Sequence, residues 1–122
     1  MDGQLVILVV DDDPSVRKST LRLLAARGYK AFEAQNAAEA LAKAIEVAPD
    51  AILMDLHMQQ TSGLEAARQL KAVAALANVP IIAVSATPPV PEEALQLFAQ
   101  VLPKPCPSND LVDAIEAALH RP

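Results

Sequence analysis

The chain has 122 residues, 52% of them apolar, and a formal net charge of -5 at pH 7. A chain of this length and composition can bury a core without disulfides or metal ions, which excludes a disordered segment. The acidic balance and the lack of a basic patch argue against direct binding to nucleic acid, which needs clustered Lys and Arg. Cys106 is the single cysteine, so no intramolecular disulfide can form and we expect a soluble, cytoplasmic protein.

The first predicted strand is the apolar run from Leu5 to Val10. Its lack of alternation is typical of a central parallel strand with helices on both faces. The run is too short for a signal peptide or a membrane span, and three aspartates follow it directly. We expect Asp13 to cap the next helix and Pro14 to occupy its first position, because the N–H that proline lacks would be unpaired there.

A short, weakly apolar segment follows from Lys30 to Ala34, and we predict a strand near a sheet edge there. Asn36 and Glu39 have the spacing of a capping box, in which each side chain accepts from the backbone N–H of the other residue. The helix that this pair opens is predicted to bury a stripe that includes Ala44 and Ile45.

The third predicted strand, from Ala51 to Asp55, is an apolar run that ends in a carboxylate. Such a run is typical of a strand buried on both faces. Ser62 and Glu65 form a second capping box, which opens the following helix. Ligands of open α/β sheets bind at the carboxyl ends of the strands, so we expect Asp55 to face a binding crevice.

Another continuous apolar strand is predicted from Val79 to Val84, and it ends at Ser85. The prolines within residues 88–91 delay the next helix. That helix can run only from about Glu92 to Phe98, so we predict it to be short.

Val101 to Pro103 is the last predicted strand. Because Pro103 has no N–H to give to a ladder, this strand is expected at a sheet edge. The final helix is predicted to face the core through Leu111 and Ile115. Strands and helices thus alternate along the whole chain, which predicts an α/β fold with a five-stranded parallel sheet and five helices on its two faces.

Four of the five predicted strands end in reactive polar groups, which are Asp11 and Asp12, Asp55, Ser85, and Lys104. Parallel strands bring these groups to one edge of the sheet. Three carboxylates in one place repel one another unless a cation lies among them, and Mg²⁺ prefers such oxygen ligands. A metal ion, a lysine and a hydroxyl together suit a phosphoryl group, so Asp55 is a candidate nucleophile that would form an aspartyl phosphate.

These residues resemble the receiver domain of two-component response regulators. The resemblance covers residues 1–122 as a single receiver domain, and its motifs are Ile7 to Pro14, Met54 to Met58 with Gly63, Ser85-Ala86 and Lys104-Pro105. It implies a flavodoxin-like, doubly wound sheet of strand order 2-1-3-4-5. Several of the motifs look especially like receivers attached to hybrid histidine kinases.

By matching positions, the resemblance implies that Asp55 is the phosphoacceptor. Asp12 would bind Mg²⁺ directly and Asp11 mostly through water. The backbone carbonyl of His57 would complete the protein ligands. Phosphorylation by a phosphohistidine, on a histidine kinase or a histidine phosphotransfer domain, is then the expected input of a phosphorelay.

The resemblance also implies that Ser85 and Lys104 bind the phosphoryl oxygens and that the Lys104-Pro105 bond is cis. The expected output is a changed affinity of a protein-binding face, and not enzymatic turnover. The sequence contains no DNA-binding or catalytic segment, so a downstream protein or a domain outside this chain is expected to respond.

Two features depart from the family pattern. Val101 stands three residues before Lys104, where many receivers carry a Tyr or Phe that swings inward when the serine moves, and a valine cannot make that swing. The interval from Ser85 to Lys104 is shorter than in common receivers by about one helical turn. His57 and Thr87 match positions that tune hydrolysis of the aspartyl phosphate in relatives, so we expect them to influence its lifetime.

Two other functions fit parts of the sequence. A set of residues also resembles the motifs of haloacid dehalogenase-type phosphohydrolases: Asp11, Asp13, Ser85 and Lys104. In such an enzyme Asp11 would be the nucleophile, which leaves Asp55 without a role. The other alternative is a receiver-like module that binds a protein without being phosphorylated; the intact acidic set argues against it, and Val101 leaves it open.

Overall fold

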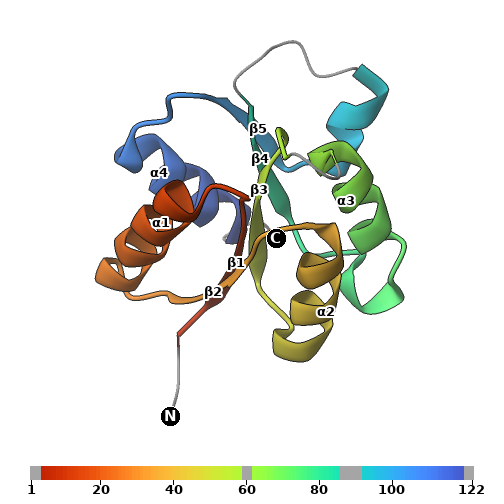
Figure 1. Cartoon of the computed structure of the whole chain (residues 1–122), viewed down its shortest axis with the longest axis horizontal. Coiled ribbons are helices and arrows are strands. Elements are labelled where there is room, and N and C mark those ends of the chain that lie inside the picture. The colour runs from red at the N-terminus through yellow and green to blue at the C-terminus, as the bar shows by residue number, and fades with distance from the viewer. Residues whose placement is uncertain (1–3, 59–61, 86–91, 120–122) are drawn as a thin grey trace.

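The computed structural model describes residues 4–58, 62–85 and 92–119. Its strands form one parallel sheet of order β2-β1-β3-β4-β5 (Figure 1). The strands are β1 Val6–Val10, β2 Lys30–Ala34, β3 Ala51–Asp55, β4 Ile81–Ser85 and β5 Gln100–Pro103. The predicted strand order is confirmed, and so are the edge positions of β2 and β5.

The described ranges contain four α-helices, which are α1 Pro14–Ala26, α2 Ala37–Val47, α3 Gly63–Lys71 and α4 Ser108–Leu119. Figure 1 shows α1 and α4 on one face of the sheet and α2 and α3 on the other. This is the doubly wound arrangement that the alternation of elements predicts.

The prediction of five α-helices was wrong for the described part of the chain. The segment between β4 and β5 contains a 3₁₀ helix, η2 (Glu92–Leu97), and a second short one, η1 (Ala74–Leu76), follows α3. Few residues separate the last proline of the 88–91 stretch from β5, and a short segment gains too few hydrogen bonds to form an α-helix. The tighter 3₁₀ form suits such short pieces. Predictions about Ala86, Thr87 and the prolines of 88–91 lie outside the described residues.

Side-chain caps open three of the helices as predicted. Asp13 accepts hydrogen bonds from the backbone N–H groups of the first turn of α1. The Asn36 side chain accepts from the N–H of Glu39 at 2.9 Å, and that of Ser62 accepts from the N–H of Glu65 at 3.2 Å. Because these caps fix where the helices begin, they also fix the loops that precede them.

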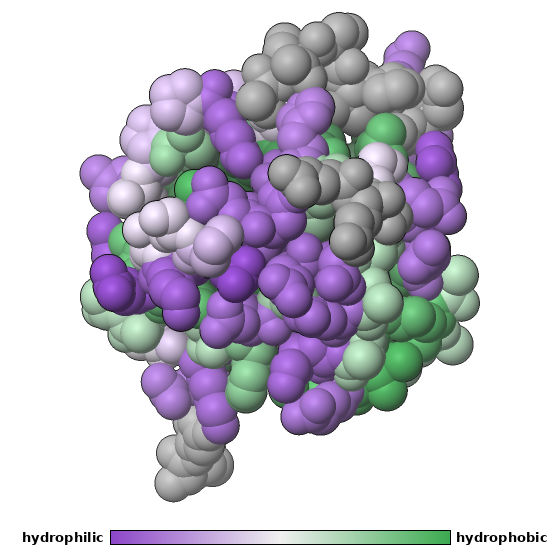
Figure 2. All heavy atoms as spheres, viewed as in Figure 1, coloured by the Kyte–Doolittle hydropathy of each residue, from purple (hydrophilic) through white to green (hydrophobic). Residues whose placement is uncertain are grey.

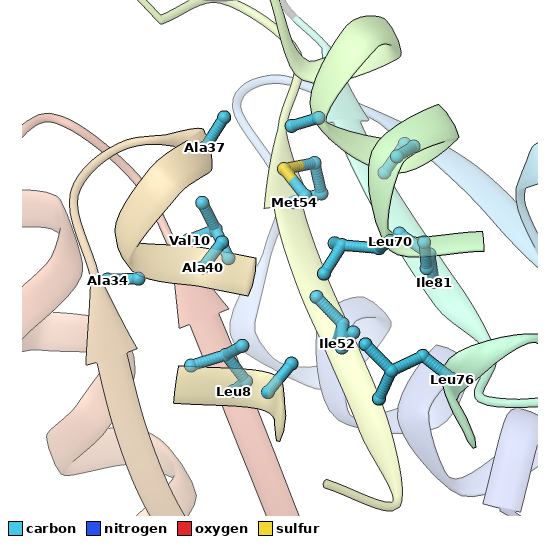
Figure 3. Close-up of a cluster of buried hydrophobic side chains, with 14 of the residues drawn as sticks. Leu8, Val10, Ala34, Ala37, Ala40, Ile52, Met54, Leu70, Leu76 and Ile81 are labelled. Atoms are coloured by element: carbon cyan, nitrogen blue, oxygen red, sulfur yellow. The ribbon is translucent and has the colours of Figure 1, made fainter. Parts of the chain in front are cut away.

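The core on the α2 and α3 face is built from alternate strand residues. Figure 3 shows Leu8 of β1 and Ile52 and Met54 of β3 pointing toward Ala40 of α2 and Leu70 of α3. All five side chains are fully or almost fully buried. A register shift of one residue would move these side chains to the opposite face of the sheet and disrupt their packing.

The opposite face of the sheet has its own core. Val9 and Leu53 alternate with the residues just named and pack with Leu24 of α1 and with Leu111 and Ile115 of α4. Both faces of β1 and β3 are therefore covered, as their continuous apolar runs predict.

The prediction that Ile45 is buried was wrong. Ile45 is 60% exposed, whereas the buried residues of α2 are the alanines Ala37, Ala40 and Ala44. Each helical residue is turned by about 100° from the one before it, so Ile45 lies beside the alanine row and not on it. The small side chains of that row let α2 lie close to the sheet.

The molecular surface viewed in Figure 2 is mostly hydrophilic, with apolar residues gathered at the lower right, where Figure 1 places η1. Within the described ranges, none of the helices combines the length and the apolar character that crossing a membrane requires.

Gly63, the first residue of α3, lies against the end of β3. A Cβ atom at this position would lie 2.6 Å from the backbone oxygen of Asp55 and 2.6 Å from the Cα of Leu56. The Gly63 N–H also donates to the Leu56 carbonyl at 3.2 Å. The lack of a side chain therefore lets α3 approach the backbone that carries Asp55.

We expect Gly63→Ala to destabilise the protein by about 1–3 kcal/mol, because the added methyl group meets backbone that cannot easily move. Chemical denaturation measures this change in the free energy of unfolding. Arg68→Ala, at an exposed position of the same helix, serves as the control and should change it by less than about 0.5 kcal/mol. Equal stability of Gly63→Ala and the parent would show that α3 is not held this closely.

Candidate functional site

Three carboxylates converge at the carboxyl edge of the sheet. Asp11 directly follows β1, Asp12 comes next, and Asp55 is the last residue of β3. One oxygen from each of the three lies within 4.8 Å of the others. Asp11 and Asp55 are each only 6% exposed. The structure therefore brings together the three acidic residues that the sequence places at strand ends.

Backbone N–H groups orient two of these carboxylates. The Asp13 N–H donates to Oδ1 of Asp11 at 2.9 Å, and the His57 N–H donates to Oδ1 of Asp55 at 2.9 Å. In both cases the donor lies two residues after the aspartate, which is the pattern of an Asx-turn. The turn that follows each strand thus helps to fix the direction of its carboxylate.

Lys104 and Ser85 complete the group of side chains expected at this edge. The Lys104 Nζ lies 3.1 Å from Oδ2 of Asp55, and the lysine side chain is 31% exposed. Ser85 ends β4 and is 6% exposed. The Lys104 N–H donates to the Ser85 carbonyl at 2.9 Å, which ties the end of β5 to the end of β4. The Lys104-Pro105 bond is cis, as the resemblance implies.

The side chain of His57 is exposed, but it faces the site. Its Nε2 lies 3.3 Å from Oγ of Ser85. Ring nitrogens of histidine act as donors or acceptors depending on the tautomer. The resemblance implies a role for the backbone carbonyl of this residue and an influence on the lifetime of the aspartyl phosphate, but spacing along the chain gave no signal for the side-chain contact with Ser85.

The buried position of Asp11 changes its acidity. Desolvation by burial raises the pKa of Asp11, and this effect outweighs the hydrogen bond from the Asp13 N–H, which lowers it. The negative charge of Asp55 raises the pKa further, and the positive charge of Lys104 opposes that increase. The folded protein therefore holds an ionised Asp11 at a free-energy cost.

A divalent cation fits this set of ligands. Three carboxylate oxygens within 4.8 Å of one another match the oxygen ligands that Mg²⁺ prefers, and the ion usually keeps several waters besides. A bound cation would also offset the repulsion that raises the pKa of Asp11. The residues present therefore suit Mg²⁺ on chemical grounds.

Arg17 and Glu33 support the site, although the sequence analysis did not single them out. Arg17 donates from Nη1 to the Asp11 carbonyl at 2.8 Å and from Nε to Oε1 of Glu33 at 2.6 Å. The Arg17 side chain is only 11% exposed. Glu33 pairs with Val9 across the β1–β2 ladder. The sequence gave no signal for the contact between Arg17 and Glu33, because these residues lie on different elements that only the folded structure brings together.

A cavity of about 450 Å³ adjoins the site between α1, α4 and the sheet. Its polar lining includes Asp11, Asp55, Lys104 and Thr20, and apolar side chains such as Val16 and Leu111 line much of the remainder. Cys106 also lines it, and burial raises the pKa of the Cys106 thiol. A thiol of this kind is a poor nucleophile, so Cys106 serves as a packing residue here.

Comparisons with known proteins agree on one family for this chain. A family model described as response regulator receiver domain matches residues 7–116. Response regulator MprA from Mycobacterium sp. (strain KMS) is 38% identical over 118 residues, which cover 94% of this chain and 50% of the relative. MprA from Mycobacterium leprae is 37% identical over 118 residues, with 94% and 51% covered. The chain thus spans about half the length of these curated relatives.

Solved structures of related proteins are also similar to this chain. The chemotaxis protein CheY4 of Vibrio cholerae has a TM-score of 0.90 at 26% identity, with 96% of this chain and 100% of that chain covered. The response regulator TrrA of Thermotoga maritima, solved in complex with Mg²⁺-BeF, has a TM-score of 0.86 at 26% identity, with 95% and 100% covered. The similarity to receivers of hybrid histidine kinases stays a prediction.

The raised pKa of Asp11 predicts how stability depends on pH. Folding favours the protonated carboxyl, so the ionised form destabilises the folded state. This penalty is absent below the ordinary Asp pKa of about 3.9, grows as the pH rises toward the raised folded value, and is complete above it. We expect Asp11→Asn to raise the unfolding temperature at about pH 7 without Mg²⁺, and this gain to vanish near pH 3.

With Mg²⁺ present, we expect the parent to become more stable than Asp11→Asn. At a concentration of 100 times its Kd, Mg²⁺ would stabilise the parent by about 2.7 kcal/mol, whereas Asp11→Asn lacks one of the carboxylates. Calorimetric unfolding with and without Mg²⁺ measures both effects. Asp113→Asn, at an exposed position of α4, is the control and should alter neither. A parent that gains no stability from Mg²⁺ would contradict the proposed metal site.

Arg17→Lys tests whether Arg17 helps to orient Asp11 at the acidic site. Lysine keeps the positive charge but lacks the planar fork that contacts both the Asp11 carbonyl and Glu33. We expect the Kd for Mg²⁺ to rise about tenfold, as for other losses of groups that orient metal ligands. Isothermal titration with Mg²⁺ measures the Kd, and Arg22→Lys, on the exposed side of α1, should match the parent. Unchanged affinity in Arg17→Lys would mean that Arg17 does not orient the ligands.

Proposed function

The chain belongs to the receiver domains of two-component response regulators, and on that premise we propose that Asp55 accepts a phosphoryl group from a phosphohistidine. The donor would be a histidine kinase or a histidine phosphotransfer domain. The observation that carries this proposal is the convergence of three carboxylates and Lys104 at one edge of the sheet. Asp55 is the member of this group that lies closest to Lys104, with 3.1 Å between Oδ2 and Nζ.

The proposed transfer exchanges one bond to phosphorus for another. An oxygen of Asp55 forms a bond to phosphorus while the bond from phosphorus to the donor imidazole breaks, and the electron pair leaves with the imidazole nitrogen. Lys104 is placed to neutralise one phosphoryl oxygen, and Ser85 to donate a hydrogen bond to another. Asp11, Asp12, Asp55 and the His57 carbonyl would hold Mg²⁺, which supplies positive charge against the approaching anion.

The domain is proposed to act as a switch and not as an enzyme that turns over a free substrate. Residues 1–122 would form one domain of this kind, in the cytoplasm, and phosphorylation would change the affinity of a face for a downstream protein. Val101 packs against the core beside η2, and its side chain has no aromatic ring that could swing inward. His57 and Thr87 are proposed to influence the lifetime of the aspartyl phosphate.

Incubation with acetyl phosphate and Mg²⁺, followed by intact-mass spectrometry, tests the phosphoacceptor. We expect one phosphoryl adduct on the parent and none on Asp55→Asn or without Mg²⁺. Lys104→Ala should fold and bind Mg²⁺ but form the adduct at least about tenfold more slowly, because it loses a charge-assisted contact to the phosphoryl group. The exposed Asp113→Asn should be phosphorylated like the parent.

Two other outcomes of this experiment would contradict the proposed role of Asp55. An adduct that survives in Asp55→Asn would move the nucleophile to another residue, with Asp11 as the first candidate. No adduct under any condition, from acetyl phosphate or from a phosphohistidine donor, would favour a binding module that works without phosphorylation.

A further inference from the structure

The cavity beside the acidic site has apolar walls for which the proposed phosphoryl transfer has no use. Its volume is about 450 Å³, and it lies between the sheet and the two helices α1 and α4, which share one face of the sheet (Figure 1). Val9 and Leu53 of the sheet, Val16 of α1 and Leu111 of α4 belong to these walls. Ligand pockets in proteins usually have volumes of about 300–1,000 Å³ and mostly apolar walls with a few polar groups. The cavity therefore has the size and lining of a site for a small molecule.

A groove on the surface adjoins this cavity. It lies between α1 and the start of α4, has a volume of about 330 Å³, and shares four lining residues with the cavity: Val16, Thr20, Cys106 and Leu111. Val16 is 42% exposed, although it is apolar. A molecule that entered between α1 and α4 would cover this apolar surface, which favours binding.

Negative charge is in excess at the inner end of the cavity. Asp11 and Asp55 line this end and are almost fully buried, and a carboxylate oxygen of Asp12 lies within 4.8 Å of theirs. The charged side chains that act on Asp11 are Asp55, Lys104 and Asp12. Three negative charges thus face one positive charge, which leaves an excess of two negative charges before a metal ion binds.

Lys104 does not make this end of the cavity a site for anions. Its Nζ already lies 3.1 Å from Oδ2 of Asp55, so its charge is offset within the site. Arg17, which binds the Asp11 carbonyl, is paired with Glu33. A carboxylate at the end of a ligand would therefore meet net repulsion, whereas an ammonium group would be attracted and has three protons to donate.

Bound Mg²⁺ would reverse this preference. Its two positive charges would cancel the excess at the three carboxylates, so the site would then suit a phosphoryl group and no longer an ammonium group. Mg²⁺ and a ligand with an ammonium end are therefore alternative occupants of the same carboxylates.

We propose that the cavity binds a small primary amine with an apolar body. The ammonium group pairs with Asp11 and Asp55 in place of Mg²⁺, and the apolar body lies against Val16, Leu53 and Leu111. The bound amine keeps Mg²⁺ from the carboxylates and so opposes phosphorylation. Only this last consequence rests on the proposed function, because the amine site itself depends on the cavity and its charges.

Isothermal titration of the Mg²⁺-free protein with three probes of similar shape tests the proposal. Phenylbutylamine, phenylbutanol and phenylbutyrate share an apolar body and end in an ammonium, a hydroxyl and a carboxylate group. We expect the Kd for phenylbutylamine to be at least about tenfold below that for phenylbutanol, and phenylbutyrate to bind most weakly. Butylamine, which lacks the ring, should bind at least about tenfold more weakly than phenylbutylamine, because it buries less apolar surface.

Competition with Mg²⁺ and one substitution locate the amine. Saturating Mg²⁺ should raise the Kd for phenylbutylamine at least about tenfold and leave that for phenylbutanol within about twofold. Val16→Lys places a positive charge at the opening of the cavity and should raise the Kd for phenylbutylamine at least about fivefold. Ala25→Lys adds the same charge at an exposed position of α1 outside the cavity and the groove, and it should match the parent.

Each other result would overturn the proposal. Equal Kd values for the amine and the alcohol would mean that the carboxylates do not hold the ammonium group. An unchanged Kd in Val16→Lys would place the amine elsewhere on the protein, and an unchanged Kd in saturating Mg²⁺ would mean that the two cations do not share ligands. A parent that binds the amine as expected but forms no phosphoryl adduct would refute the proposed function alone, whereas a normal adduct without amine binding would refute the amine site alone.

Discussion

The burial of β3 between β1 and β4 is the constraint on which the site depends. Parallel pairing on both sides of this strand aligns the three carboxyl ends, so Asp55 must lie beside Asp11 and Ser85. Side chains from both faces of the sheet hold the register, because a shift by one residue would turn Ile52 and Leu53 out of their cores. The apolar packing that stabilises the domain therefore also fixes the geometry of its polar edge.

That edge works against stability. Asp11 and Asp55 are almost fully buried, and burial is the main reason that the pKa of Asp11 is raised. Lys104 offsets part of the negative charge through its contact with Asp55, and two backbone N–H groups pair with the carboxylates. The remaining imbalance suits the site to a cation, which would also supply positive charge for the proposed phosphoryl transfer. Strain of this electrostatic kind is typical of functional sites.

Small residues and short connections give the site its shape. Gly63 lets α3 meet the backbone after β3, and the alanine row of α2 lets that helix lie close to the sheet. On the other side of the site, η2 occupies the short stretch before β5, and Val101 packs into the core beside it. The contacts of Ser85 with His57 and of Arg17 with Asp11 then connect the strand ends to one another. The described contacts of the site come from the loops after β1 and β3 and from α1, whereas β5 carries no aromatic side chain.

Local patterns in the sequence were sufficient for much of this architecture. Continuous apolar runs predicted β1, β3 and β4, capping residues predicted the starts of α1, α2 and α3, and the lack of an N–H in Pro103 predicted an edge strand. The polar residues at strand ends could be grouped because parallel strands share one carboxyl edge, and the structure does bring them together. The tertiary structure decided features that depend on partners distant along the chain. These are the exposure of Ile45, the support of Asp11 by Arg17 and Glu33, and the contact between His57 and Ser85. Burial and side-chain pairing are properties of the packed fold, so spacing along the chain carries no record of them.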